Sequence, residues 1–197
     1  VGATVREDLK QGNKERGYQL TDFDKNKKVL LVMGGSLGSK KLNNIIRQNI
    51  EALLHDYQII HLTGKGLVDD SINKKGYVQF EFVKDDLTDL LAITDTVVSR
   101  AGSNAIYEFL SLRIPMLLIP LGLDQSRGDQ IDNAKNFESK GYGRHIPEDQ
   151  LTEVNLLQEL NDIELHRESI IKQMETYQES YTKEDLFDKI IHDALNK

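Results

Sequence analysis

The chain has 197 residues, of which 39% are hydrophobic and three are proline, so it is long enough to bury a core and is expected to form one globular domain. It carries 25 Lys and Arg against 32 Asp and Glu, a net charge of −7, and no cysteine, which excludes thiol catalysis, disulfides and thiolate metal sites. No run of about 18 apolar residues occurs, so no membrane span is predicted. No basic stripe with interleaved aromatic residues is present, which argues against a nucleic-acid partner.

Short apolar strand-like runs alternate with amphipathic helical patterns along most of the chain. Residues 1–26, which precede them, are polar and irregular, as is typical of a hinge or linker. The predicted strands are residues 28–33, 58–62, 77–82, 96–99, 115–120 and 143–146, and the predicted helices are residues 40–54, 65–73, 87–93, 105–112 and 130–140. After residue 148 only helical patterns follow, at residues 156–160, 163–177 and 186–195, and the acidic excess lies there, with 13 acidic against five basic residues in 147–197. A solvated helical surface is the expected result.

Strict alternation of strands and helices predicts an α/β fold, a Rossmann-like parallel sheet with helices on both faces. Ligands of such sheets lie at the carboxyl ends of the strands. The loops that follow the predicted strands are rich in glycine and in small polar or charged residues, and they comprise residues 34–38, 63–66, 100–104 and 121–130.

The most informative of these loops lies between Ser99 and Glu108, where a strand end, a small-residue turn and a helix start follow one another. Gly102 is expected to supply the turn, and Ser103 or Asn104 to cap the helix. Free N–H groups at a helix start attract phosphate. Glu108 lies roughly 7 Å further along the helix axis. A diphosphate with an attached ribose is therefore predicted to bind here.

The glycine-rich stretch at residues 34–38 follows a buried strand and opens a helix. It lacks the second glycine of the dinucleotide fingerprint, because Ser36 stands there, and it lacks the Gly-Lys-Ser/Thr ending of a phosphate-binding P-loop. Two interpretations stay open for it, a ligand-binding loop and a tight packing turn. The polar residues 124–133 likewise fit either sugar hydroxyls or ordinary helix capping.

Several single residues also have two interpretations. Arg100 could pair with a diphosphate or with a neighbouring carboxylate, and Lys65, at the predicted start of a helix, could contact an anion. His61 ends a strand, and a structural histidine is favoured over a functional one. Asp85 and Asp86 precede a predicted helix, where acidic residues are common, so a metal pair is disfavoured and no metal site is predicted.

Taken in order, five segments resemble one enzyme family, the peptidoglycan N-acetylglucosaminyltransferases of the GT-B fold, which convert lipid I to lipid II. The segments are residues 2–6, 34–39, 61–65, 100–108 and 127–134. Each is weak alone, and all five in order are specific. The resemblance covers nearly the whole chain, corresponds to the C-terminal, donor-binding half of these enzymes, and is closest to the staphylococcal members.

The resemblance implies a domain organisation and a set of binding residues. Residues 1–26 would be the interdomain connection, residues 27–179 the domain that binds UDP-N-acetylglucosamine, and residues 180–197 a C-terminal helix able to pack toward the N-terminal half. The implied donor contacts are Glu108 to the ribose hydroxyls; Ser103, Asn104 and Ala105 to the diphosphate; Val83, Lys84 and Leu87 to the uracil; Arg6 and Ser36 to the nucleotide and diphosphate; and Asp129 and Gln130 to the sugar. Asp129 departs from the family pattern, in which many members have two adjacent glutamines.

The family also implies a reaction. The 4-hydroxyl of the acceptor attacks the anomeric carbon with inversion, UDP leaves, and no cofactor or metal is needed. The general base, the lipid I site and the membrane-binding patch would belong to the N-terminal half, so this chain would hold no catalytic base and would be inactive alone. The full-length enzyme would be cytoplasmic and peripheral on the inner face of the cell membrane.

Three alternatives stay open. Two are other GT-B-like enzymes that use UDP-sugars, a diacylglycerol glucosyltransferase and a UDP-N-acetylglucosamine 2-epimerase. The third is a natural nucleotide-sugar-binding subunit that works with a separate membrane partner.

Overall fold

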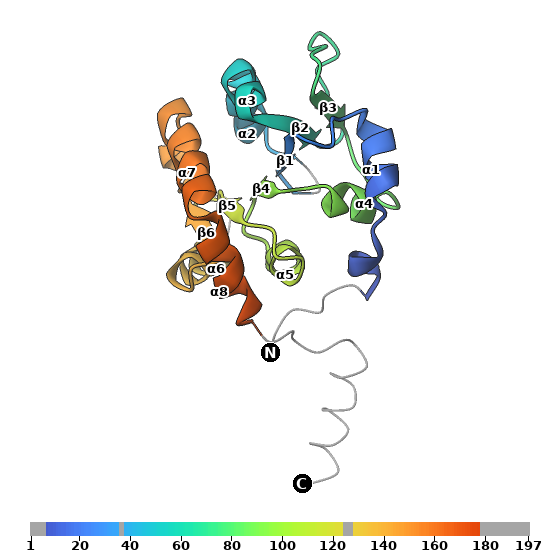
Figure 1. Ribbon diagram of the computed structural model, residues 1–197. Coiled ribbons are helices and arrows are strands. Elements are labelled where there is room, and N and C mark those ends of the chain that lie inside the picture. The colour runs from blue at the N-terminus through green and yellow to red at the C-terminus, as the bar shows by residue number, and fades with distance from the viewer. Residues whose placement is uncertain (1–6, 36–37, 124–127, 178–197) are drawn as a thin grey trace, which may run out of the picture.

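The computed structural model describes residues 7–35, 38–123 and 128–177. At its centre is a six-stranded sheet in the order β3-β2-β1-β4-β5-β6, in which every neighbouring pair is parallel (Figure 1). The strands are β1 (Lys28–Met33), β2 (Tyr57–Leu62), β3 (Tyr77–Phe80), β4 (Thr96–Ser99), β5 (Met116–Leu118) and β6 (Gly143–His145). The six predicted strands and the Rossmann-like fold class are confirmed.

Helices connect the strands and cover the sheet. They are α1 (Lys14–Thr21), α2 (Lys40–Gln48), α3 (Ile50–Asp56), α4 (Leu87–Ala92), α5 (Ser103–Ser111), α6 (Asp129–Ser139), α7 (Glu153–Leu165) and α8 (Arg167–Glu175), with short 3-10 turns η1 (Glu7–Gln11) and η2 (Glu148–Gln150). The single predicted helix at 40–54 is two helices, because the backbone at Asn49 departs from helical geometry, with φ −106° and ψ 14°. The predicted helix at 186–195 lies outside the described residues.

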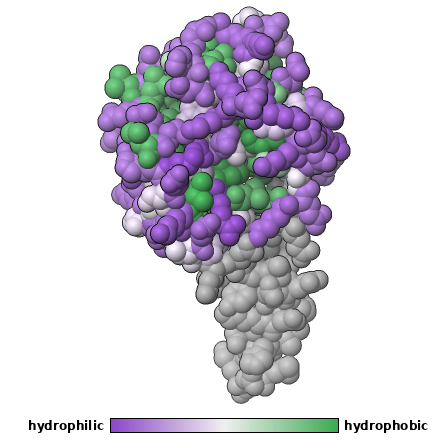
Figure 2. Space-filling model, viewed as in Figure 1, coloured by the Kyte–Doolittle hydropathy of each residue, from purple (hydrophilic) through white to green (hydrophobic). Residues whose placement is uncertain are grey.

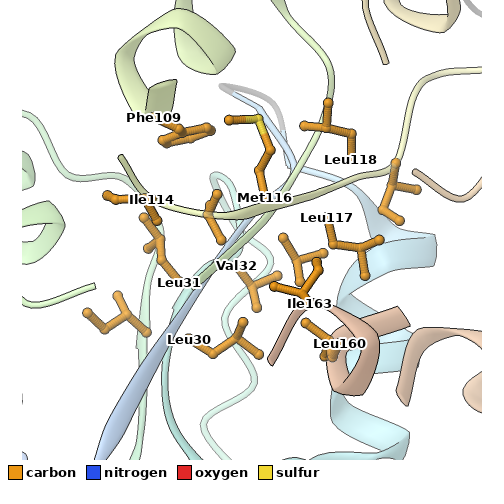
Figure 3. Close-up of a cluster of buried hydrophobic side chains, with 14 of the residues drawn as sticks. Leu30, Leu31, Val32, Phe109, Ile114, Met116, Leu117, Leu118, Leu160 and Ile163 are labelled. Atoms are coloured by element: carbon orange, nitrogen blue, oxygen red, sulfur yellow. The ribbon is translucent and has the colours of Figure 1, made fainter. Parts of the chain in front are cut away.

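The core is built on both faces of the central strands. Leu30, Leu31 and Val32 of β1 have no exposed surface, and all six residues of β2 are buried. Figure 3 shows Phe109 of α5 on one side of the sheet and Leu160 of α7 on the other. Because successive side chains of a strand point to opposite faces, two-sided burial favours a continuous apolar run, such as residues 29–33 of β1.

The sequence suggested that residues 7–26 are irregular, but the structure shows that they form η1 and α1 and pack against the domain. Leu9 and Phe23 are buried, and Gly17 of α1 lies so close to α4 that a Cβ atom there would come within 2.4 Å of the Asp89 carbonyl oxygen. Asp89 accepts a hydrogen bond from the backbone N–H of Asn13 at 2.7 Å. The prediction failed because the apolar residues of this segment are few and widely spaced in sequence. The segment is buried by packing against α4, which a local pattern does not show.

The predicted helix at residues 65–73 is also wrong. Gly66 has a φ of +71°, and the segment from 65 to 76 runs through turns. The Gln79 amide donates to the Asp69 carbonyl oxygen at 2.9 Å, and a guanidinium N–H of Arg47 donates to the Leu67 carbonyl oxygen at 2.5 Å. Side chains from β3 and α2 thus satisfy backbone groups that a helix would have paired internally.

The face of the molecule drawn in Figure 2 is mainly polar. On the face drawn in Figure 2, hydrophilic residues predominate and the hydrophobic ones form small separate groups. Among the helices of the described segments, none is both long and apolar enough to cross a membrane.

Candidate functional site

A cleft of about 610 Å³ opens at the carboxyl ends of β1, β4 and β5. Its walls come from the loop after β1, from the turn between β4 and α5, and from the start of α6. Chain connections run in opposite directions from β1 and β4, because β1 continues to β2 and β4 continues to β5. Ligands of open α/β sheets bind at such a switch point.

A larger hollow, about 850 Å³, lies between α3 and α7 and is lined by the first residues of β1 and β2, Lys28 and Tyr57. It is at the amino ends of the strands, opposite the edge where ligands of this fold bind. The smaller cleft is therefore the candidate site.

The glycine-rich loop after β1 forms one wall of the cleft. A Cβ atom at Gly38, where φ is +73°, would come within 2.1 Å of the Thr63 carbonyl oxygen, and one at Gly34 would come within 2.6 Å of the Ser39 backbone nitrogen. These two glycines are required by packing. Gly35 has a φ of +89° and open space around it. The described glycines of this loop thus pack tightly at Gly34 and Gly38, and all three border the cleft.

The start of α5 forms the facing wall. Gly102 occupies the N-cap position with φ −69° and ψ 133°, and no side chain among the described residues caps the helix. The prediction that Ser103 or Asn104 caps α5 is therefore wrong; both are exposed residues of its first turn, and Ala105 lines the cleft. Within the described residues, no side chain accepts a hydrogen bond from the first backbone N–H groups of α5, so these groups can donate to an anion, which the helix dipole also favours.

Nothing in the described part of the chain requires a glycine at position 102. Its φ is negative, and a Cβ atom there would meet nothing within 4 Å. Glycine is also chosen where a ligand approaches the backbone closely. Open space at Gly102 beside an uncapped helix start fits a bound anion.

Arg100 pairs with a carboxylate, which decides between the two interpretations that the sequence left open. Its guanidinium forms an ion pair with Glu148 of η2, and both side chains are 8% exposed. The same group donates to the Ile119 carbonyl oxygen at 3.1 Å and to the Ser39 hydroxyl at 2.6 Å. Arg100 therefore joins the ends of β4 and β5 to the start of α2.

His61 is a structural residue, as favoured from the sequence. The Asn43 amide donates to the Thr63 carbonyl oxygen at 2.8 Å, so the Asn43 Oδ1 atom accepts from His61 Nε2 at 2.9 Å. His61 Nδ1 then accepts from the Tyr77 hydroxyl at 2.8 Å. Burial first, and the Arg47 charge second, lower the pKa of His61 to about 3, so the ring is neutral.

The predicted nucleoside contacts lie along the same edge of the sheet but outside the cleft. Val83 and Lys84 follow β3, and Leu87 begins α4. β3 is three strand spacings, each about 4.8 Å, from β4. Glu108 follows both strands in sequence and is half-buried on α5. A ligand that spans these residues has to extend along the carboxyl edge.

Of the two predicted sugar contacts, only one lines the cleft. Gln130 lines the cleft, and its Oε1 atom accepts from the Leu121 backbone N–H at 3.1 Å, whereas Asp129 is exposed and does not line the cleft. In the polar segment 124–133, the Asn133 amide donates to the Ala101 carbonyl oxygen at 3.0 Å. Arg6, Ser36 and residues 124–127 lie outside the described residues.

Lys65 and the acidic pair before α4 do not line the cleft. Lys65 is exposed in a turn rather than at a helix start. Asp86 forms an ion pair with Arg16 of α1 at 2.5 Å. In the parts of the chain that the structure describes, no three His, Cys, Asp or Glu side chains form a group that could hold a metal ion.

Ser39 and Glu148 are among the cleft residues that were not singled out from the sequence. Ser39 is the N-cap of α2, and Glu148 lies 48 positions after its partner Arg100. A serine before an apolar helical pattern is a recognisable capping signal for Ser39. No sequence pattern signals the contact of Glu148, because only the fold brings β4 and η2 together.

The sheet order and the position of the cleft define a Rossmann-like domain, the class that binds nucleotides at its switch point. Residues 29–190 match the glycosyltransferase family 28 C-terminal domain. The chain belongs to this family, and the resemblance inferred from its sequence is confirmed.

Curated relatives are similar over the whole chain. A UDP-N-acetylglucosamine–N-acetylmuramyl-(pentapeptide) pyrophosphoryl-undecaprenol N-acetylglucosamine transferase from Staphylococcus haemolyticus is 82% identical over 99% of this chain and 55% of the relative. The Staphylococcus aureus protein of the same name is 72% identical over 100% of this chain and again 55% of the relative. The chain thus spans about half the length of these relatives.

Solved structures show the same fold at low identity. The crystal structure of MurG from Acinetobacter baumannii has a TM-score of 0.64 and is 20% identical, covering 88% of this chain and 50% of that one. The glycosyltransferase of kitacinnamycin has a TM-score of 0.63 and is 19% identical, covering 76% of this chain and 37% of that one. The match to parts of these glycosyltransferases agrees with the predicted GT-B architecture.

Proposed function

We propose that this chain binds UDP-N-acetylglucosamine and forms the donor-binding half of an inverting glycosyltransferase that transfers N-acetylglucosamine to lipid I, forming lipid II. The observation that carries the proposal is the uncapped start of α5 at the cleft, with Gly102 leaving open space beside it. The names of the staphylococcal relatives support the donor and the acceptor.

The proposed donor pose follows the carboxyl edge of the sheet. The diphosphate lies at the backbone N–H groups of Ser103, Asn104 and Ala105, and Glu108 accepts hydrogen bonds from the ribose hydroxyls. Val83, Lys84 and Leu87 border the uracil. Gln130, which lines the cleft, contacts the sugar. Asp129 is proposed as a second sugar contact because it is adjacent to Gln130. Arg6 and Ser36 are proposed to contact the nucleotide and diphosphate.

The chemistry that this pose supports is stabilisation of the leaving group. When the acceptor hydroxyl attacks the anomeric carbon, negative charge grows on the diphosphate as the bond to the sugar breaks. Fixed N–H donors at a helix start interact more strongly with that charge than with the ground state, which lowers the barrier. The general base, the lipid I site and the contact with the inner face of the cell membrane are proposed to lie in the remaining half of the enzyme.

Calorimetric titration with UDP-N-acetylglucosamine, UDP-glucose and NAD tests the donor. The first is expected to bind more tightly than the other two. Tight preference for UDP-glucose would instead favour a diacylglycerol glucosyltransferase, and preference for NAD would overturn the proposal.

A second assay tests the division of labour between the halves. This chain alone is expected to bind the donor without transferring sugar to lipid I, because the proposed base and acceptor site lie in the remaining half of the enzyme. Measurable turnover by this chain would contradict that division. Hydrolysis or epimerisation of the donor would favour the epimerase alternative.

A further inference from the structure

Ser39 lies on the wall of the cleft, at the start of α2. It is 8% exposed, and its backbone is extended, with φ −141° and ψ 108°. Its hydroxyl oxygen accepts a hydrogen bond from the backbone N–H of Leu42 at 3.2 Å, which is the capping contact of this nine-residue helix. One lone pair of the oxygen is therefore used inside α2.

Arg100 uses the other lone pair. Its Nη2 atom donates to the Ser39 hydroxyl oxygen at 2.6 Å and also pairs with the Glu148 carboxylate. Its Nη1 atom donates to the Ile119 carbonyl oxygen at 3.1 Å. Because Arg100 is 7% exposed and bonded to three separate segments, its guanidinium is fixed relative to Ser39.

A serine hydroxyl has two acceptor lone pairs and one hydrogen. With both lone pairs of Ser39 engaged, the group can act further only by donating that hydrogen. Within the described segments it donates to no protein acceptor, and Ser39 lines the cleft. The guanidinium bonded to its oxygen makes the hydroxyl a stronger donor.

The surroundings select an anionic acceptor for this hydrogen. Lys40 and Lys41 line the same cleft, and the N-terminal ends of α2 and α5 both border it. Positive charge and helix starts favour phosphate oxygens over neutral sugar hydroxyls. We propose that Ser39 donates its hydroxyl hydrogen to a phosphate oxygen of the bound nucleotide, and that Arg100 and Glu148 are positioning residues that orient it.

This inference rests on the proposed function, and titration of the chain with UDP and with uridine tests both. Ser39→Ala is expected to weaken UDP binding about tenfold, the effect of losing one hydrogen bond to a charged group. Uridine, which has no phosphate, should bind as before. Ser39→Thr, which keeps the hydroxyl, should bind UDP within about twofold of the unchanged chain.

A merely structural role gives a different result. Ser39→Ala also removes the cap of α2, so thermal unfolding of each variant is measured in parallel, and binding is compared where all are folded. If Ser39→Ala lowers the melting temperature but leaves the preference for UDP over uridine unchanged, Ser39 is only a cap and the inference is overturned. If the unchanged chain binds no UDP, the proposed function fails instead.

The positioning role of Glu148 needs its own comparison. Glu148→Gln removes the charge that holds Arg100, and it is expected to weaken UDP binding less than Ser39→Ala does. In the double variant the two effects should not add, because Glu148 acts through Ser39. Additive losses, or no loss from Glu148→Gln, would remove Arg100 and Glu148 from the proposal.

Discussion

Glu108 is the residue on which the ribose contact depends. It lies five positions after the first residue of α5 and is half-buried. Replacing it with alanine should weaken UDP binding by about 1–3 kcal/mol, because charge-assisted hydrogen bonds to the ribose are lost. Calorimetry measures this directly. Glu153→Ala, an exposed carboxylate at the start of α7, is the matched control, and equal affinities for both variants would contradict the ribose role.

His61 should make the stability of the fold dependent on pH. Its pKa is about 3 when folded and 6.5 in the unfolded chain, so between these values the unfolded state binds more protons. Stability is therefore lost as the pH falls below 6.5, by about 1.4 kcal/mol per pH unit at most. Urea unfolding at pH 7.5, 6 and 5 measures the slope.

His61→Gln is expected to lower stability at pH 7.5 and to flatten that slope. The control is His55→Gln, since the His55 side chain is 84% exposed and lies outside the core. A variant at His61 with the slope of the unchanged chain would mean that another group causes the pH dependence.

At the scale of elements, the two turns that border the cleft should respond differently to an added methyl group. In Gly38→Ala the methyl group meets the Thr63 carbonyl oxygen, and φ is positive, so stability should fall by about 1–3 kcal/mol. In Gly102→Ala the methyl group enters open space, so stability should change by about 1 kcal/mol or less.

UDP affinity, in contrast to stability, should be sensitive to the Gly102→Ala substitution. If a diphosphate lies against this turn, the methyl group occupies its space, and affinity should fall by about 1–3 kcal/mol even though the fold is intact. Thermal unfolding and calorimetry on the same samples separate the two effects. Unchanged UDP affinity in Gly102→Ala would place the diphosphate elsewhere.

The sequence predicts an element well where the local pattern of apolar residues is sufficient to define it. The buried runs of β1 and β2 and the helix that begins near residue 130 are of this kind, and the structure has all three. Residues 65–73 have apolar spacing like that of a helix, but partners from β3 and α2 hold them in turns. Such contacts depend on residues distant in sequence, so local patterns do not contain them.

The same limit applies to the site. The turn before α5 and Gln130 are recognisable from small and polar residues after strands, and both border the cleft. The capping of α5 was predicted wrongly, because a polar residue after a glycine signals a cap whether or not the helix has already begun. Pairing of Arg100 with a neighbouring carboxylate was one of two open interpretations, and only the fold shows that the carboxylate is that of Glu148.

At the scale of the whole molecule, the carboxyl and amino ends of the strands differ in what they contact. The carboxyl edge holds the cleft, and the amino edge is joined to the C-terminal helices through Glu164 of α7. Glu164 forms ion pairs with Lys28 of β1 and Arg167 of α8 and accepts hydrogen bonds from Tyr57 and Thr96 at 3.1 Å each. This carboxylate therefore connects α7 and α8 to three strands.

The charge of Glu164 should stabilise this connection at neutral pH. Burial raises its pKa, but hydrogen bonds from Arg167 and Lys28 together outweigh burial and lower the pKa to about 2, below the usual 4.5. The contribution is therefore complete above pH 4.5 and is lost as the pH falls toward 2. Glu164→Gln should lower the free energy of unfolding at pH 7 by about 1–3 kcal/mol, allowing for partial screening by solvent.

Urea unfolding from pH 8 to 4 tests this contribution. The difference between Glu164→Gln and the unchanged chain should be constant down to about pH 5 and shrink below 4.5, because the native carboxylate of the unchanged chain then loses its advantage over the unfolded one. Glu15→Gln is the control: Glu15 pairs with Lys25 at 2.6 Å, but both side chains are more than half exposed, so about 0.5 kcal/mol or less is expected. UDP affinity should be the same in both variants, since Glu164 lies at the edge opposite the cleft. A loss of UDP binding in Glu164→Gln would mean that the two edges of the sheet are coupled.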